Sequence, residues 1–494
     1  MRRRSLPLVL LLLPGCPRST PPTEAPQPAP TTDAAEPAPA ALPQGPLRYR
    51  GEVALPVGGP LEFFVQLQPG DAGYTGTITI PLQGAFDAPL GEIEVSDDTL
   101  AFSLVRAGAR WSATLAPDGQ ARHCALEQRG MRLPCTLEPI DEATLAAVSA
   151  PPRPQTPAPP FPYDVLEQGY DNPSDGVHLA GTLTVPEGPG PFPAALLITG
   201  SGAQDRDESL LGHKPFWVLA DHLTRRGIAV LRVDDRGMGG STGDLDLATS
   251  DALARDVAAG VGHLRRQDRI DPTRVGVIGH SEGGLLGPRV AAGDPSIAFV
   301  VMLAGPGVPG HEVLREQAAA ILRAKGFPAA TVELARHQQA KANQILLDTE
   351  DLQVARERLR ELLGDNDEIA RMVTPWFHSF VRYDPAPALK KLRCPVLVLN
   401  GELDLQVLPD QNLPAIEEAL AGNRKRTTVH RLPGLNHLFQ HAKTGMPDEY
   451  GTIEETMAPE VLDLVADWVV AQTSAQGKAK ANTGKKTGKG KKTE

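Results

Sequence analysis

The chain has 494 residues, a formal net charge of −11 and 4 cysteines. One hydrophobic core rarely grows beyond about 250–300 residues, so this length indicates two or more domains. Four cysteines are too few for a disulfide-rich scaffold or a cysteine-rich zinc protein. No apolar run approaches the ~20 residues of a membrane-spanning helix. The 48 prolines are about twice the usual share of ~5%, and their positions prove informative.

The N-terminus has the pattern of an export signal. Arg2, Arg3 and Arg4 precede the short apolar run 6–13, so we expect residues 1–15 to be a signal peptide. The next segment, Leu13-Pro14-Gly15-Cys16, is similar to a bacterial lipobox, although proline replaces the usual small residue before the glycine. This similarity predicts lipidation of Cys16 and anchoring to a bacterial membrane, on the periplasmic side. An ordinary secretory signal with an incidental cysteine is the alternative.

Proline is concentrated in two segments. Residues 17–46 contain ten prolines and residues 151–162 contain seven. Such composition favours extended, semi-rigid spacers and does not build a core. We therefore predict a tether over residues 16–46 and a linker over residues 141–163, which separate two folded parts.

The first folded part is predicted to be all-β. Residues 47–140 alternate in polarity with a period of two, as in the apolar positions of segment 61–67, and this period is typical of half-buried strands. The pattern predicts an antiparallel meander of seven or eight strands that forms a small barrel or sandwich. It contains no His, Cys or carboxylate cluster with catalytic spacing.

Export permits disulfide bonds. Cys124 and Cys135 fall on adjacent predicted strands, so we expect them to be bonded. Cys394 opens an apolar strand in the second folded part and is expected to be a buried thiol.

From residue 164 to 473 the pattern changes to strands that alternate with helices. This alternation is typical of a mostly parallel sheet flanked by helices. The apolar strand 274–278 continues directly into Gly279-His280-Ser281-Glu282-Gly283. This is the Gly-x-Ser-x-Gly nucleophile elbow in the context that it needs, with a strand before it and a helix after it. The sequence therefore predicts Ser281 as a nucleophile.

A serine hydroxyl needs a histidine base that a carboxylate orients, and in this type of fold the acid and then the histidine follow the serine in the chain. Asp404 lies just after an apolar strand, and His437 lies in a loop just after the next strand. Both are predicted members of the triad. The alternatives are Glu402, expected to be solvated within its turn, His430, expected to be structural within its strand, and His441, a weaker candidate for the base.

The oxyanion of a tetrahedral intermediate needs backbone N–H donors. One is expected from the amide of Glu282, the residue after the nucleophile. The other is expected from the loop Thr199-Gly200-Ser201-Gly202, which follows an earlier central strand. Ser201 is the predicted donor and Gly202 the alternative. A second interpretation is that these glycines only permit a turn.

Together these features resemble the α/β-hydrolase superfamily, and more narrowly the bacterial esterases grouped with serine aminopeptidase-like hydrolases. The resemblance covers residues 164–470 and is clearest in four segments: 175–183, 200–207, 234–237 and 279–284. It implies the triad Ser281, Asp404 and His437. It also implies a β-rich N-terminal domain and a helical cap over the active site. Thr199 departs from the histidine that many relatives have before the first glycine of the oxyanion loop.

Residues 305–392 have the helical spacing of such a cap. Within it, Trp376, Phe377 and Phe380 are candidates for a substrate pocket. The alternative is that they pack the cap onto the core.

The C-terminal segment 474–494 has seven lysines and one glutamate, and is predicted to be a solvated, disordered tail. An electrostatic contact with an acidic surface is the alternative. Removing this +6 and the +3 of the N-terminal arginines from −11 leaves −20 on residues 16–473. A strongly acidic body argues against nucleic acid as a partner.

No cofactor or metal is expected. The glycines of segment 237–243 follow a strand, but their spacing departs from the dinucleotide-binding fingerprint, and no zinc-binding spacing occurs. The sequence thus predicts an exported, lipid-anchored serine hydrolase that cleaves carboxylic esters of small to medium acyl groups through an acyl-enzyme. A small-molecule ester is the expected substrate. The alternatives are a peptidase or amidase with the same triad, and an inert cell-envelope binding protein.

Overall fold

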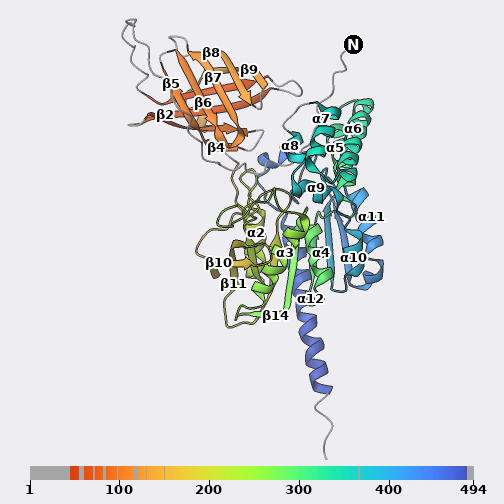
Figure 1. Cartoon of the computed structure of the whole chain (residues 1–494). Helices are drawn as coiled ribbons and strands as arrows, with labels where there is room; N and C mark the ends of the chain where they lie inside the picture. Colours follow the sequence, from red (N-terminus) through yellow and green to blue (C-terminus); the bar gives the residue numbers. More distant parts are fainter. Residues whose placement is uncertain are drawn as a thin grey trace, which may run out of the picture. The chain divides into compact units, whose positions relative to one another are not determined.

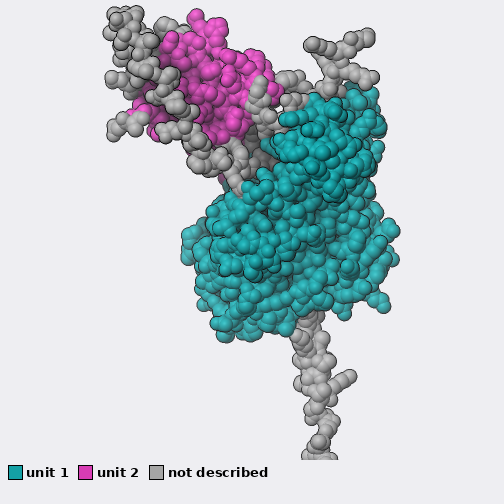
Figure 2. Space-filling model, viewed as in Figure 1, with its two compact units in different colours: residues 1–15, 153–449, 453–494 teal, residues 16–152, 450–452 magenta. Residues whose placement is uncertain are grey.

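The computed structural model describes residues 45–54, 60–70, 73–81, 85–96, 98–115, 121–128, 131–148, 151–364 and 368–486. The chain forms two compact units, which Figure 2 colours separately. We call residues 16–152 with 450–452 the β unit, and residues 153–449 with 453–494 the α/β unit. The predicted signal peptide, Cys16 and nearly all of the tether lie outside the described residues.

In its described part, the β unit is a nine-stranded antiparallel sheet (Figure 1). The order is β4-β3-β2-β1-β9-β8-β7-β6-β5. The strands are β1 (Leu47–Val53), β2 (Leu61–Gly70), β3 (Gly73–Ile80), β4 (Ala85–Pro89), β5 (Gly91–Val95), β6 (Thr99–Leu104), β7 (Ala109–Leu115), β8 (Ala121–Gln128) and β9 (Met131–Pro139). Only Leu90 separates β4 from β5 in the chain, so the sheet curls until its two end strands meet, as in a barrel.

The interior of the β unit is aromatic. The ring centroids of Phe63 and Phe102 each lie 5.5 Å from that of Trp111, and all three side chains are buried. The sequence predicted seven or eight strands, one or two fewer than the nine described. The short strand β4 was missed, because Asp87 and Pro89 interrupt the alternation there.

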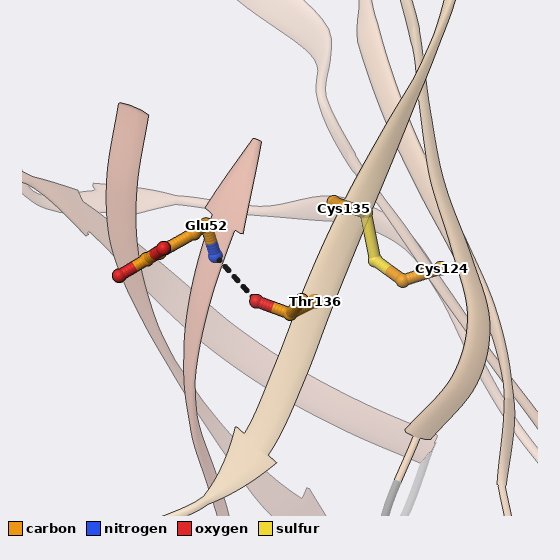
Figure 3. The surroundings of a disulfide bond; sticks show 4 residues. All are labelled: Glu52, Cys124, Cys135 and Thr136. Carbon is orange, nitrogen blue, oxygen red and sulfur yellow. Dashed lines mark hydrogen bonds between the residues drawn. A yellow bond between two sulfur atoms is a disulfide. The ribbon is translucent and has the colours of Figure 1, made fainter. Parts of the chain in front are cut away.

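A disulfide bond joins Cys124 on β8 to Cys135 on β9, with 4.9 Å between the Cα atoms (Figure 3). Beside it, the backbone N–H of Glu52 on β1 donates to Thr136 Oγ1 at 3.1 Å. Cys394, in the α/β unit, is half-buried, where the sequence predicted a buried thiol. Desolvation raises the pKa of this thiol to about 11.

The predicted linker is more ordered than its composition indicates. It begins with the short helix α1 (Glu142–Ala146), in which the side chain of Asp141 accepts from the N–H of Thr144 at 2.7 Å. The linker residue Arg153 donates to the carbonyls of Ile453 and Leu211 at 2.6 and 3.0 Å. The segment from residue 153 onward is therefore part of the α/β unit and not a free spacer, because it hydrogen-bonds to the folded chain.

The α/β unit is built on a mixed, mostly parallel sheet of eight described strands. The order is β10-β11-β13-β12-β14-β15-β16-β17, and β11 is antiparallel to both of its neighbours. The strands are β10 (Tyr163–Asn172), β11 (Val177–Pro186), β12 (Phe192–Ile198), β13 (Ala229–Val233), β14 (Ile270–His280), β15 (Val300–Leu303), β16 (Val396–Gly401) and β17 (Thr427–Leu432). This sheet and the separate β unit agree with the predicted fold class.

Helices cover both faces of this sheet (Figure 1). One face packs against α3, α4, α10 and α11, and the other against α2 and α12. Their bounds are α2 (Pro215–Arg225), α3 (Ser250–Leu264), α4 (Gly283–Gly293), α10 (Ala386–Lys391), α11 (Pro409–Ala419) and α12 (Pro459–Lys486). Two faces of apolar contact explain why the central strands are apolar at successive residues.

The cap consists of α5 (Gly310–Ala324), α6 (Ala329–Asp348), α7 (Leu352–Leu363), α8 (Glu368–Met372) and α9 (Pro375–Arg382). These helices share an apolar cluster that also includes Leu285 of α4 and Leu245 of the loop before α3. The predicted cap of 305–392 extends too far, because Leu389 and Leu392 of the α10 region belong to the core beside the sheet.

Helix α12 continues to Lys486, so the predicted disordered tail begins too early. The backbone from residue 474 to 486 remains helical as an extension of a helix whose first turns are buried against the sheet. Within the described chain, we find no helix with the length and apolarity to cross a bilayer.

Candidate active site

Ser281 lies at the turn between β14 and α4. Its backbone has φ of 52°, the left-handed region that costs a non-glycine residue roughly 1–2 kcal/mol. The turn is possible only with glycine around it. A Cβ on Gly279 would lie 2.0 Å from the carbonyl oxygen of Gly283, and a Cβ on Gly283 would lie 2.1 Å from that of Ile198. The elbow is held by the N–H of Ser281, which donates to the carbonyl of Leu303 at 2.8 Å.

The structure brings the predicted acid and base together. Asp404 follows β16 and His437 follows β17, and His437 Nδ1 lies 2.8 Å from Asp404 Oδ2. Both residues are only 1% exposed. Because an ionised carboxylate only accepts, Nδ1 carries the proton and Nε2 is left as an acceptor.

Three further donors fix the carboxylate of Asp404. Its Oδ1 accepts from the backbone N–H groups of Gln406 and Val407 at 2.8 and 2.9 Å, and its Oδ2 accepts from Asn400 Nδ2 at 2.9 Å. This set of donors stabilises the ionised form and aims one oxygen at His437.

The hydrogen bonds within the described part of the chain do not include one between Ser281 Oγ and His437. Such contacts are often long in unliganded enzymes and tighten only in the complex.

The predicted oxyanion loop lies against Ser281, the predicted nucleophile. A Cβ on Gly200 would lie 3.2 Å from Ser281 Cβ, so only glycine allows this approach without displacement. The N–H of Gly200 is already used, because it donates to Glu208 Oε1 at 2.8 Å. In the described chain, the backbone amides of Ser201 and Glu282 have no hydrogen-bond acceptor. They are available as the two predicted donors.

The side chain of Glu282 is a feature that the sequence did not reveal. Its carboxylate is buried and accepts from Trp376 Nε1 at 3.2 and 3.1 Å, and from the hydroxyl of Ser201. Burial raises the pKa of Glu282 to about 7, although these two hydrogen bonds oppose the shift. Glu282 therefore links the elbow, the oxyanion loop and the cap.

This contact separates the three aromatic candidates. Trp376 on α9 reaches Glu282, beside the nucleophile. Phe377 has no exposed surface and packs in the apolar cluster of the cap, and Phe380, stacked on Trp376 with centroids 6.3 Å apart, belongs to the same cluster. For Phe377 the packing interpretation is correct, because a side chain without exposed surface does not line a pocket.

A cavity of about 60 Å³ borders the oxyanion loop. Thr199, Gly200, Asp235 and Glu282 line its polar side. Thr199, which stands where many relatives have histidine, donates to Asp235 Oδ1 at 2.7 Å. Desolvation, with the nearby carboxylates of Glu282 and Glu208, raises the pKa of Asp235 well above its usual value.

The alternative residues lie in other surroundings. Glu402 is exposed and accepts from the N–H of Gly434 at 3.4 Å. His430 is half-buried within β17. His441 is exposed and pairs with Glu455 and Glu460. Around the site, sequence analysis also missed Glu208, Asn400 and the role of His280. Only His280 had a signal, since it stands within the elbow motif itself.

The described residues include no group of three or more His, Cys, Asp or Glu arranged to hold a metal ion.

Comparison with known proteins places this site in a family. The family of X-Pro dipeptidyl-peptidases (S15 family) matches residues 175–433, which include Ser281 and Asp404. The chain belongs to this family. The match ends four residues before His437, and the β unit lies outside it.

Among curated proteins, the esterase EstD of Thermotoga maritima is 30% identical over 296 residues. The alignment covers 59% of this S15 family chain and 65% of the relative, so it spans less than two thirds of the relative's length.

Among the solved structures to which this chain is similar is Est1E from Butyrivibrio proteoclasticus with bound ferulic acid. It is 17% identical, with a TM-score of 0.39 over 61% of this chain and 96% of that one. Another is the proline iminopeptidase of Mycobacterium smegmatis, 18% identical, with a TM-score of 0.39 over 63% of this chain and 100% of that one.

Proposed function

We propose that this S15 family protein is a serine hydrolase that cleaves carboxylic esters of small to medium acyl groups through an acyl-enzyme. The observation that supports this most directly is the buried Asp404–His437 pair, with 2.8 Å between Oδ2 and Nδ1. It stands at the same sheet edge as the strained serine of a strand–elbow–helix turn, which is the arrangement of an α/β-hydrolase. The 30% identity to an esterase supports the ester as substrate.

The proposed reaction begins when His437 Nε2 accepts the proton of Ser281 Oγ, which attacks the carbonyl carbon of the ester. The imidazolium that forms is stabilised by Asp404, whose carboxylate accepts four hydrogen bonds. The tetrahedral oxyanion accepts from the amides of Ser201 and Glu282. His437 then returns the proton to the departing alcohol, which leaves an acyl ester on Ser281.

Hydrolysis of the acyl-enzyme repeats these steps with water. His437 takes a proton from water, the resulting hydroxide attacks the acyl carbon, and the proton passes to Ser281 Oγ as the acid leaves. Each backbone donor of an oxyanion hole is worth about 2.7–4 kcal/mol in the transition state. Two such donors together contribute a rate factor on the order of 10⁴ or more.

The test uses the purified full chain and nitrophenyl esters of two to eight carbons. We expect hydrolysis with a burst of nitrophenol, and loss of about 10⁶ in turnover for Ser281→Ala. Thermal unfolding of the variant checks that it is folded. Full activity of folded Ser281→Ala would refute the assignment.

A second candidate is a peptidase that releases X-Pro dipeptides, favoured by the family match over residues 175–433. The triad can serve either an ester or an amide leaving group. Matched substrates with one X-Pro acyl group, as a nitrophenyl ester and as a nitroanilide, separate the two. Comparable kcat/KM on both would favour the peptidase, and activity on the ester alone would favour the esterase.

An inert cell-envelope binding protein is excluded if a fluorophosphonate labels Ser281 stoichiometrically. Unlabelled Ser281 with ligand binding by the β unit would support that interpretation instead.

We further propose that the protein is exported and anchored by a lipid on Cys16. The charged and apolar N-terminal segments and the proline-rich tether support this proposal. Two or more acyl chains would anchor it stably, since each buried methylene contributes about 0.8 kcal/mol. Mass spectrometry of the mature N-terminus should find acylated Cys16, and an unmodified cleavage product would refute the anchor.

A further inference from the structure

A buried histidine and a buried glutamate lie directly behind the proposed catalytic groups. His280, the residue before the nucleophile, is 6% exposed, and Glu208, in the chain after the oxyanion loop, is 4% exposed. His280 Nδ1 lies 2.9 Å from Glu208 Oε1, and His280 Nε2 lies 3.0 Å from the carbonyl oxygen of His437. The imidazole rings of His280 and His437 are 4.8 Å apart between centroids.

These contacts determine how many protons the pair holds. A carbonyl oxygen only accepts, so His280 Nε2 must carry a proton and donate to His437. Glu208 Oε1 also accepts from the N–H of Gly200 at 2.8 Å, which favours an ionised carboxylate. The contact between Nδ1 and Oε1 then needs a second proton on the imidazole. The arrangement is satisfied by an imidazolium paired with a carboxylate.

The electrostatics agree with this arrangement. Burial by itself lowers the pKa of His280, but the charge of Glu208 and the hydrogen bonds to Glu208 and His437 outweigh it, so that the pKa is raised. The other groups that face His280 are the carboxylate of Asp404, which also raises the pKa, and the ring of Phe439, which lies 6.5 Å away between centroids.

The pair connects three segments that are distant in the chain. Glu208 holds the oxyanion loop through Gly200, and His280 is continuous with Ser281. His280 also holds the loop of the base through the carbonyl of His437. The relative positions of oxyanion donor, nucleophile and base therefore depend on one buried ion pair. Glu208 has φ of 54°, a left-handed conformation that costs energy for glutamate, and its contacts compensate for it.

We propose that the Glu208–His280 ion pair is a positioning device that sets the oxyanion loop and the His437 loop against Ser281. This inference rests on the proposed hydrolase function. Neither side chain is a catalytic residue, because both act through the segments that they hold.

The variant Glu208→Gln tests the proposal by replacing one carboxylate oxygen with an NH₂ group. A glutamine can still accept from Gly200, but its neutral amide does not maintain the imidazolium. A neutral His280 has a single ring proton, so it cannot donate to both residue 208 and His437. If the glutamine turns its NH₂ group toward Nδ1 instead, the bond from Gly200 is lost. Because substrate binding does not use these bonds, we expect kcat to fall at least tenfold with KM within about twofold. The matched control is Glu402→Gln, an exposed carboxamide beside the acid loop, expected to keep kcat within about twofold.

A second measurement does not depend on the folding of Glu208→Gln or on activity. Nitrogen-15 NMR of the histidine rings in the full wild-type chain, assigned with His280→Gln, reports how many ring protons His280 has. Two N–H groups on His280 at pH 7 are expected. A neutral His280 at pH 7 would overturn the proposal, and so would full kcat in a folded Glu208→Gln variant.

If the proposed hydrolase function is wrong, the experiments give a result that differs from failure of the positioning device. Wild-type protein without hydrolysis of any ester or amide, or a fully active Ser281→Ala, would refute the hydrolase. The NMR arm would still decide whether the ion pair exists. An active wild type with unchanged kcat in Glu208→Gln would refute the positioning device alone.

Discussion

Replacement of Asp404 by asparagine should remove the catalytic tautomer of His437 without removing the shape of the site. Asp404 accepts two hydrogen bonds on each carboxylate oxygen: Gln406 and Val407 donate to Oδ1, and Asn400 and His437 donate to Oδ2. An asparagine must place its NH₂ group at one of these positions, where it meets two donors.

The structure indicates which orientation wins. A backbone N–H group can only donate. An NH₂ group facing Gln406 and Val407 would therefore leave two buried donors unsatisfied, at a cost of about 1–3 kcal/mol each. At the other position, Asn400 Nδ2 keeps its hydrogen bond to the carbonyl of Val407 at 3.2 Å, and the ring of His437 can respond by moving its proton to Nε2 and accepting at Nδ1. The amide therefore points its NH₂ at His437 and stabilises the tautomer that cannot take the proton of Ser281.

The same change of tautomer in a Ser-His-Asp protease lowers kcat about 10⁴-fold, which is equivalent to about 5 kcal/mol in the activation barrier. We expect a loss of this size in Asp404→Asn, with KM nearly unchanged, measured on nitrophenyl butyrate at pH 7.5. The control Glu402→Gln should keep kcat within about twofold. A folded Asp404→Asn with less than a tenfold loss would refute the assignment of Asp404, and a large loss in Glu402→Gln would transfer the role to Glu402.

Three further predictions concern stability. The pKa of Glu282 is raised to about 7, so with rising pH the unfolded chain releases this proton before the folded chain does. The free energy of unfolding should therefore fall by roughly 3 kcal/mol between pH 4.5 and 7. Urea titrations of Glu282→Gln should show a flatter dependence on pH in this range, and an unchanged slope would contradict the raised pKa. Ser281→Gly should unfold at a higher temperature than Ser281→Ala, by the equivalent of about 1 kcal/mol. Both variants lack the hydroxyl, but only glycine relieves the strain of φ at 52°, so equal melting temperatures would argue against backbone strain. Loss of the Cys124–Cys135 bond, with a sequence separation of 11, should destabilise the β unit by about 3 kcal/mol, whereas calorimetry of Cys394→Ser should show the β-unit transition unmoved.

Much of the site followed from local sequence. The elbow needs small residues on both sides of Ser281, and a pentapeptide between an apolar strand and a helix is a local pattern. Asp404 and His437 were predicted because parallel strands all present their carboxyl ends at one edge of the sheet. Chain order alone thus indicated which side chains would meet, although 33 residues separate the acid from the base.

Two predictions of unstructured segments failed for different reasons. The linker composition indicates a spacer, yet hydrogen bonds to Ile453 and Leu211 hold Arg153 in the α/β unit. The lysine-rich segment indicates disorder, yet helix α12 extends through residue 486. Contacts elsewhere in the fold decide the conformation of the linker, whereas the alanines and lysines of segment 474–486 are good helix formers that continue α12.

The sequence by itself determined the two-part organisation, the alternation of strands and helices, and the sharp turn that carries Ser281, the proposed nucleophile, because these depend on periodicity and on the steric needs of one turn. Only the tertiary structure decided what surrounds those groups. Glu208 and Glu282 are buried whereas Glu402 is exposed, and burial is a property of all the elements packed around a side chain. The same packing places His280, a variable position of the Gly-x-Ser-x-Gly motif, against Glu208, with which it forms the proposed ion pair.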